Sequence, residues 1–131
     1  MPLAAGDILE LDTQLAPVLL APIGTALGAL ARDRLVRGAR AHLARADLGL
    51  AAAQVVASLV AGACAGLGEP GAAFLVAGFA GGLSTWSSLS VDAVGWWRAR
   101  RWGLLAFHMV LVLGLSMTAF VGGRALAGGG A

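Results

Sequence analysis

The sequence predicts an all-α membrane protein with four transmembrane helices, the third of which is broken at a segment rich in glycine, serine and threonine. Apolar residues make up 59% of the 131 residues, and charged residues only 12%. A soluble domain of this length cannot bury so much apolar surface, so we expect lipid to surround much of the chain. Four apolar stretches are long enough, or nearly so, to cross a bilayer: residues 15–31, 48–67, 72–91 and 103–123. We therefore treat residues 1–131 as a single transmembrane domain.

The first span, residues 15–31, is the shortest of the four. Asp12 and Thr13 precede it and are expected to cap the N-terminus of its helix. Gly24 and Gly28 form a GxxxG pair, a pattern typical of close contact between membrane helices. We therefore expect a short first helix that packs tightly against a neighbour.

The second span, residues 48–67, contains two polar residues. Gln54 and Ser58 are four residues apart and so lie on one face of the helix. A buried glutamine needs partners for its amide, and interhelical hydrogen bonds in membranes contribute only about 0.6 kcal/mol on average. A structural hydrogen bond and a ligand contact fit Gln54 equally well. The Gly-Glu-Pro-Gly sequence at residues 68–71 then predicts a tight turn into the third span.

The third span, residues 72–91, has the least regular pattern. Three glycines occur in the five residues from Gly78 to Gly82, and five hydroxyl side chains follow in the seven residues from Ser84 to Ser90. Glycine weakens a helix, and serine and threonine offer hydrogen bonds to freed backbone groups. One interpretation is a break at mid-membrane whose exposed carbonyls hold a cation. The other is a helix interface at which small residues permit close approach.

The fourth span, residues 103–123, places His108 near one end. A histidine within a membrane is a candidate proton relay, but none of the four predicted spans holds a carboxylate. The nearest acid, Asp92, directly follows the third span. We therefore expect His108 to form a hydrogen bond or to lie at the membrane interface.

The basic residues are all arginine, and they predict the orientation of the chain. The connections between spans 1 and 2 and between spans 3 and 4 share one side and hold eight arginines: Arg32, Arg34, Arg37, Arg40, Arg45, Arg98, Arg100 and Arg101. The opposite side holds Arg124 alone. The positive-inside rule then predicts a multi-pass protein of the cell membrane with both termini outside. Arg32, at the end of the first span, is an interface anchor or an anion-attracting residue.

Other function classes are disfavoured. The arginines flank apolar spans instead of covering a soluble face, so nucleic-acid binding is not expected. Cys64 is the only cysteine, and the chain has no pattern of a nucleophile, a metal cluster or a phosphate-binding loop. We therefore do not expect an enzyme.

The third span also carries a resemblance to a known family. Residues 78–92 read G-F-A-G-G-L-S-T-W-S-S-L-S-V-D and resemble the third-helix signature of the Fluc (CrcB) fluoride channels, approximately G-F-x-G-G-F-T-T-F-S-T-F-S-x-E. Residues 28–32, G-A-L-A-R, look like the end of that family's first helix. Gln54 stands where an asparagine is usual, and His108 where a tyrosine is typical. The similarity extends over all four spans.

The resemblance implies a dimer of oppositely oriented subunits that encloses two fluoride paths and a central sodium ion. By position, the backbone carbonyls of Gly81 and Ser84 would hold the sodium ion. The fluoride path would be lined by Gln54, Ser58, Thr85, Trp86, Ser88, Leu89 and His108. Trp86 and Leu89 stand where two phenylalanines usually line that path. An aromatic ring presents a positive edge to an anion, which Trp86 retains and Leu89 lacks.

The leading functional hypothesis is therefore passive fluoride export. Fluoride that enters as the neutral acid is trapped inside as the anion, and a negative-inside potential drives it out through a channel. An arginine bias of eight to one predicts a fixed orientation, hence pairing with a separate, oppositely oriented homologous subunit. Two alternatives remain. One is a small multidrug-type proton-coupled antiporter, which needs a carboxylate within the membrane; the other is a non-conducting assembly subunit, favoured if Leu89 abolishes the path.

Overall fold

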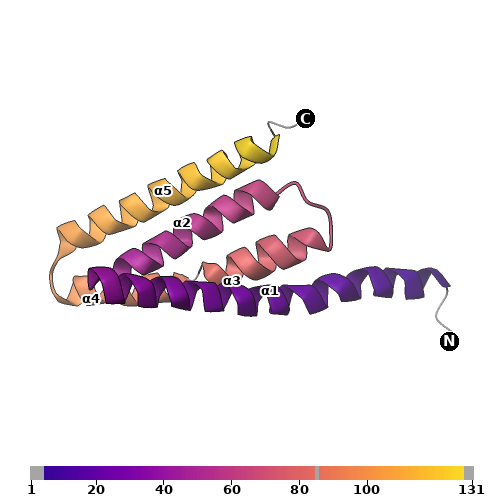
Figure 1. The fold of residues 1–131 in the computed structure, drawn as a ribbon, viewed down its shortest axis with the longest axis horizontal. Helices are drawn as coiled ribbons and strands as arrows, with labels where there is room; N and C mark the ends of the chain where they lie inside the picture. Colours follow the sequence, from indigo (N-terminus) through magenta and orange to yellow (C-terminus); the bar gives the residue numbers. More distant parts are fainter. Residues whose placement is uncertain (1–4, 85, 129–131) are drawn as a thin grey trace.

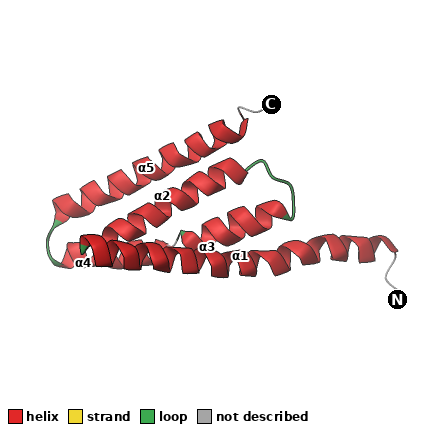
Figure 2. Cartoon of the chain, in the orientation of Figure 1, coloured by secondary structure: helices red, strands yellow, loops and turns green. Residues whose placement is uncertain are grey.

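The computed structural model describes residues 5–84 and 86–128, and its regular elements over those residues are all helical (Figure 2). They are α1 (Ala5–Leu43), α2 (Ala46–Cys64), η1 (Ala73–Ala80), α3 (Gly81–Leu83), α4 (Trp86–Arg98) and α5 (Trp102–Gly128). Four stretches are long and apolar enough to cross a membrane: Leu15–Leu43, Ala46–Cys64, Ala73–Arg98 and Trp102–Gly128. The prediction of an all-α membrane protein with four transmembrane helices is confirmed.

The first helix is much longer than predicted. α1 contains 39 residues, which corresponds to about 58 Å, against a hydrocarbon core of about 30 Å. The predicted arginine-rich loop after residue 31 was wrong, because the helix continues through the arginines to Leu43. Arg37 forms an ion pair with Asp33 one turn earlier, a spacing that supports a helix. Asp12 and Thr13 lie inside α1, so the prediction that they cap its start was also wrong.

The connections that follow α1 and α4 are short and lie at the same end of the molecule. They comprise residues 44–45 and 99–101. Ala44 and Arg100 take left-handed conformations, with φ of 53° and 54°, which end the preceding helices. The beginning of α1 and the end of α5 lie at the opposite end of the molecule (Figure 1). The predicted side-by-side placement of the two basic connections is therefore confirmed, and so is a turn between α2 and η1.

Glycines of α1 set its contact with the third span. A Cβ atom at Gly24 would meet the backbone oxygen of Phe74, and one at Gly28 would meet that of Phe79 and lie 2.7 Å from the backbone nitrogen of Leu83. The two backbones therefore touch, and side chains larger than hydrogen cannot fit between them. The contact predicted from the GxxxG pair is confirmed, with η1 and α3 as the partner.

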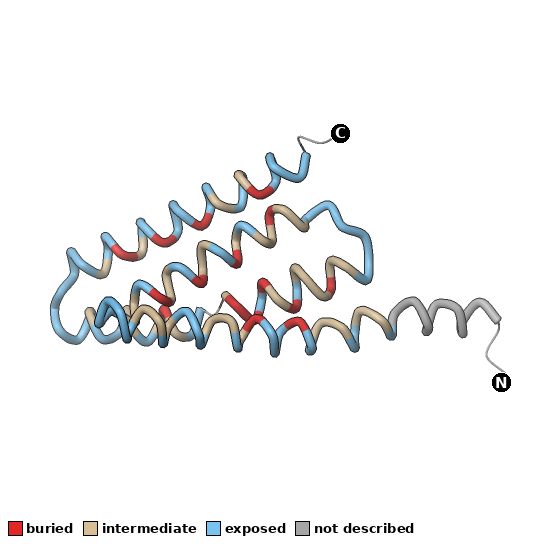
Figure 3. The backbone as a smooth tube through the Cα atoms, in the orientation of Figure 1, coloured by how far each residue is buried: buried red, intermediate tan, exposed pale blue. Residues whose placement is uncertain are grey.

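Helix α2 packs between α1 and α5. Gly62 of α2 lies against the backbone of Phe120, and Gly123 of α5 lies against that of Leu59. Buried positions recur along the facing sides of α2 and α5 (Figure 3). Because lipid is as apolar as a side chain, close packing of small residues must supply much of the association energy between these helices. The fold thus presents one tight seam between α2 and α5 and another between α1 and the third span.

Candidate functional site

The third span is interrupted at Ser84. Helix α3 ends at Leu83, and Ser84 adopts an extended conformation with φ −90° and ψ 112°. α4 begins at Trp86. A helix that stops leaves the carbonyls of its last turn without intrahelical partners. The predicted break is therefore confirmed. Thr85, assigned to the fluoride path, lies outside the described residues.

The break is tied to α2 by a hydrogen bond between two predicted site residues. The Ser84 hydroxyl donates to Oε1 of Gln54 at 2.8 Å, although the two residues are 30 positions apart. Of the two interpretations of Gln54, the structural hydrogen bond is thus present. Its amide nitrogen has two N–H donors of its own, the type of group that binds an anion. Gln54 therefore lies where it both fixes the break and presents donors beside it.

The two glycines before the break face opposite environments. Gly82 is buried, and a Cβ atom there would meet the backbone oxygen of Thr25 and lie 2.8 Å from its Cα atom. Gly81 is exposed, and the nearest atom to its Cβ position is the Val76 oxygen at 3.9 Å. Gly82 therefore holds the break against α1, whereas the backbone at Gly81 is open on the outer side of the chain.

Three buried polar atoms lie on the inner sides of α4 and α5. Asp92 Oδ2, His108 Nε2 and Ser116 Oγ have no hydrogen-bond partner within the described part of the chain. Buried polar atoms are rarely left unpaired, and such atoms often mark bound water, an ion or a functional role. The ring centroid of His108 lies 4.7 Å from that of Trp96, and Asp92 is close enough to interact electrostatically with His108. The interface between α4, α5 and their neighbours therefore contains three polar atoms whose hydrogen-bonding capacity is not met by the described residues.

His108 is buried on the inner side of α5. Its side chain is 5% exposed, and Nε2 has no hydrogen-bond partner among the described residues. Its expected position at the membrane interface stays a prediction. The helix of the third span extends beyond residue 91 to Arg98, so Asp92, expected to follow that span, lies within its helix. Ser116 was missed as a site residue, although its eight-residue spacing from His108 places both on one helical face.

The helix register brings Ser58 and Ser116 to the same level. Gly62 of α2 lies against Phe120 of α5, and both helices run away from the arginine-rich end. One turn earlier in each helix are Ser58 and Ser116, so the two serines lie at the same height along the seam. Polar side chains therefore occur at successive levels of the bundle, beginning with His108 nearest the arginines.

A groove of about 510 Å³ opens at the arginine-rich end, between the two basic connections. Its lining includes Arg45, Asp47, Asp92, Trp96 and Arg101. The Arg45 guanidinium donates to the Asp47 carboxylate at 2.7 Å, and this bond raises the pKa of Arg45 above its ordinary value. Trp96 lines the groove and its ring also lies 4.7 Å from that of His108, so the groove lies next to the buried polar atoms.

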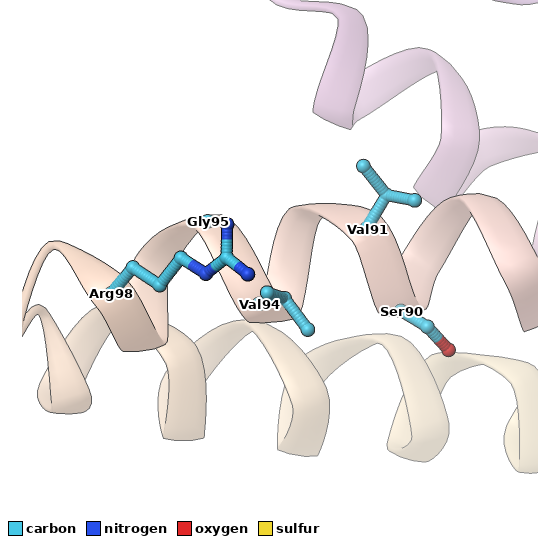
Figure 4. Close-up of a pocket in the computed structure, with 5 residues that line it drawn as sticks. All are labelled: Ser90, Val91, Val94, Gly95 and Arg98. Carbon is cyan, nitrogen blue, oxygen red and sulfur yellow. The ribbon is translucent and has the colours of Figure 1, made fainter.

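The outer face of α4 is poorly covered within this chain. Trp86 is 60% exposed and Val91 72%, whereas Leu89 is 5% exposed on the inner side. A depression of about 450 Å³ lies beyond the break, lined by Ser90, Val91, Val94, Gly95 and Arg98 (Figure 4). The structure thus places the two predicted pore-lining side chains, Trp86 and Leu89, in different surroundings. Ser88 on α4 and Arg32 on α1 are both half-buried.

Candidate cation ligands at the break are backbone and hydroxyl oxygens. The described residues contain no group of three or more His, Cys, Asp or Glu side chains that would hold a metal ion. The interruption of the helix at Ser84 instead leaves backbone carbonyls without intrahelical partners, and such oxygens suit a hard cation. The residues present therefore fit a cation such as sodium at this point.

Comparison with known proteins agrees with this arrangement. A family profile described as CrcB-like protein, Camphor Resistance (CrcB), matches residues 19–124. A search of curated proteins gives no match. The matched region reaches all four membrane-spanning helices and includes every site residue described above. The chain therefore belongs to the CrcB family, the Fluc family of fluoride ion channels.

Proposed function

We propose that the chain is one subunit of a fluoride-selective channel that exports fluoride from the cytoplasm. The observation that carries the proposal is the break at Ser84, which interrupts the family-like third span beside the amide of Gln54. A negative-inside membrane potential drives an anion outward, so export needs no second energy source. The chain is proposed to have no enzymatic activity.

The proposed path uses donors from several helices. A partly dehydrated anion is stabilised by N–H and O–H groups and by the positive edges of aromatic rings. Gln54 and the exposed Trp86 indole supply such groups near the break. The remaining proposed path residues are Ser58, Thr85, Ser88, Leu89 and His108, and Arg32 attracts anions towards the path.

A sodium ion is part of the proposal. The Gly81 and Ser84 carbonyls would hold it, and the open backbone at Gly81 supports a site shared with a second subunit. A cation bound there supplies fixed positive charge close to the anion path.

An antiparallel dimer is proposed because the outer face of α4 lacks cover within the chain. That face combines exposed apolar side chains with the hydroxyl of Ser87, a poor match to lipid alone. The eight-to-one arginine bias supports a separate, oppositely oriented homologous subunit as the partner.

A proton-coupled antiporter of the small multidrug type is the second candidate. Asp92 lies in the helix of the third span and interacts electrostatically with His108, so its carboxylate is the candidate for the titratable group that this chemistry requires. A non-conducting assembly subunit is the third candidate.

Fluoride efflux from reconstituted vesicles distinguishes the three functions. The proposal expects efflux of fluoride in preference to chloride when the chain is reconstituted with an oppositely biased homologue, at a rate set by voltage. A rate that instead follows an imposed pH gradient at fixed voltage would indicate the antiporter. Flux that depends only on the partner's residues would indicate an assembly subunit.

The orientation gives a separate prediction. With both termini outside, a reporter that is active only outside the cytoplasm should work when fused to either end, and one active only in the cytoplasm should fail. The reason is the eight arginines at the opposite end of the helices. Equal signals from both reporter types would mean dual insertion and would remove the need for a separate partner.

The hydrogen bond between Ser84 and Gln54 gives another prediction. Ser84→Ala and Gln54→Leu should each lower thermal stability slightly, by about 0.6 kcal/mol, and lower fluoride flux by more. Because both changes remove the same bond, the double variant should be less destabilised than the sum of the single variants. Thr118→Ala is the control, because Thr118 is exposed on α5 and its hydroxyl bonds only within its own helix, to the Gly114 carbonyl. If the losses of stability and of flux in the two single variants add up to those of the double variant, the two residues are not coupled.

A further inference from the structure

A second groove lies between the end of α1 and the beginning of α2. Its volume is about 450 Å³, and its lining includes Arg34, Leu35, Gly38, His42, Leu43 and Leu48. Both helices are membrane-spanning segments, and the groove lies at their arginine-rich ends. It therefore opens where the apolar layer of the bilayer meets the headgroups.

The shape of this groove depends on two glycines. Gly49 brings the helices together, because a Cβ atom there would lie 2.7 Å from the Cα atom of Val36. Gly38 has no neighbouring atom within 4 Å of its Cβ position, so the floor of the groove is open. Leu43 and Leu48 are 60% and 40% exposed along its walls. An open, mainly apolar channel of this kind matches an acyl chain.

The charges around the groove favour an anionic headgroup. Arg37 is paired with Asp33, and Arg45 with Asp47 at 2.7 Å. Arg34, by contrast, has no carboxylate partner within residues 5–84 and 86–128 and carries an uncompensated positive charge. Basic pockets between helices at a membrane surface bind anionic lipid headgroups.

We infer that this groove binds one anionic phospholipid, with an acyl chain against Leu43 and Leu48 and the phosphate near Arg34. His42 lies at the rim and offers an additional N–H donor to the headgroup. The site belongs to the membrane leaflet at the arginine-rich end. It does not depend on whether the chain conducts fluoride.

Native mass spectrometry of the delipidated chain tests the site, with dioleoyl phosphatidylglycerol and dioleoyl phosphatidylcholine as the two probes. The wild type should bind phosphatidylglycerol more tightly. Arg34→Gln should weaken that binding by about fivefold, the effect of one arginine at an anionic surface. Arg40→Gln, on the same helix but outside the groove lining, should change it little.

Gly38→Leu tests occupancy of the groove itself. The added side chain has open space around it and should leave the fold intact while lowering retention of both lipids. Gly103→Leu is the matched control, because Gly103 also has nothing within 4 Å but does not line the groove. Equal affinity for the two lipids, or equal effects of Arg34→Gln and Arg40→Gln, would overturn the inference. So would a change in subunit assembly by Gly38→Leu without loss of lipid, which would identify a protein occupant.

Discussion

Gly82→Ala is expected to destabilise the protein strongly and to abolish fluoride flux. The new methyl group would point at the backbone of Thr25, whose Cα atom lies 2.8 Å from the Cβ position. Overpacking usually costs about 1–3 kcal/mol, and this site belongs at the upper end because a helix backbone must move. Thermal unfolding in detergent, together with fluoride-electrode efflux from vesicles, measures both effects.

Gly81→Ala is the matched comparison, since it makes the same chemical change one position earlier. Its methyl group would have no neighbour closer than 3.9 Å among the residues that the structure describes, so the unfolding temperature should be nearly unchanged. Under the channel proposal its flux should still fall, because the methyl group crowds the open carbonyl surface. Wild-type stability for Gly82→Ala would mean that α1 and the break are not rigidly packed. Wild-type flux for Gly81→Ala would remove Gly81 from the proposed sodium site.

The helices could be predicted from the sequence because their main signal is local. Apolar length marks each span, and the glycine and hydroxyl pattern marks the break at Ser84. The extent of α1 was missed because five arginines from Arg32 to Arg45 were interpreted as a loop. Arginine, alanine and leucine are good helix formers, and the Asp33–Arg37 pair adds support at the i,i+4 spacing. Charge indicates where a helix leaves the hydrocarbon layer, whereas it does not indicate where the helix ends.

The site was predicted less completely because its geometry depends on contacts between distant segments. Gln54 and Ser84 were each identified, but nothing local indicates that residues 30 positions apart share a hydrogen bond. The different burial of Trp86 and Leu89 has the same origin, since it depends on how α4 is rotated against its neighbours. Asp92 was identified as the acid nearest to the predicted spans, but its burial depends on how α4 packs against α5.

The variant Leu89→Phe tests whether a buried side chain of α4 lines the fluoride path. Leu89 is 5% exposed, so Leu89→Phe must enlarge a side chain in a filled space and should lower stability by about 1–3 kcal/mol. If Leu89 is the defect in the path, the new ring should nevertheless restore or raise fluoride flux per folded subunit when a suitable partner is present. Loss of stability without any gain in flux would count against Leu89 as a pore-lining residue.

Trp86→Ala is expected to lower fluoride flux by roughly tenfold, which corresponds to a loss of about 1.4 kcal/mol of anion stabilisation. Trp86 is 60% exposed, so its removal should cost the isolated subunit little stability. Trp86→Phe keeps an aromatic edge and should retain much of the flux, although it loses the indole N–H. Trp97→Ala is the control, because Trp97 is 58% exposed on the same helix but lies near the arginine-rich end. Efflux measurements on vesicles that contain each variant with the same partner compare the three directly. Equal flux from Trp86→Ala and Trp97→Ala would exclude Trp86 from the path and would leave the partner to supply every essential ring.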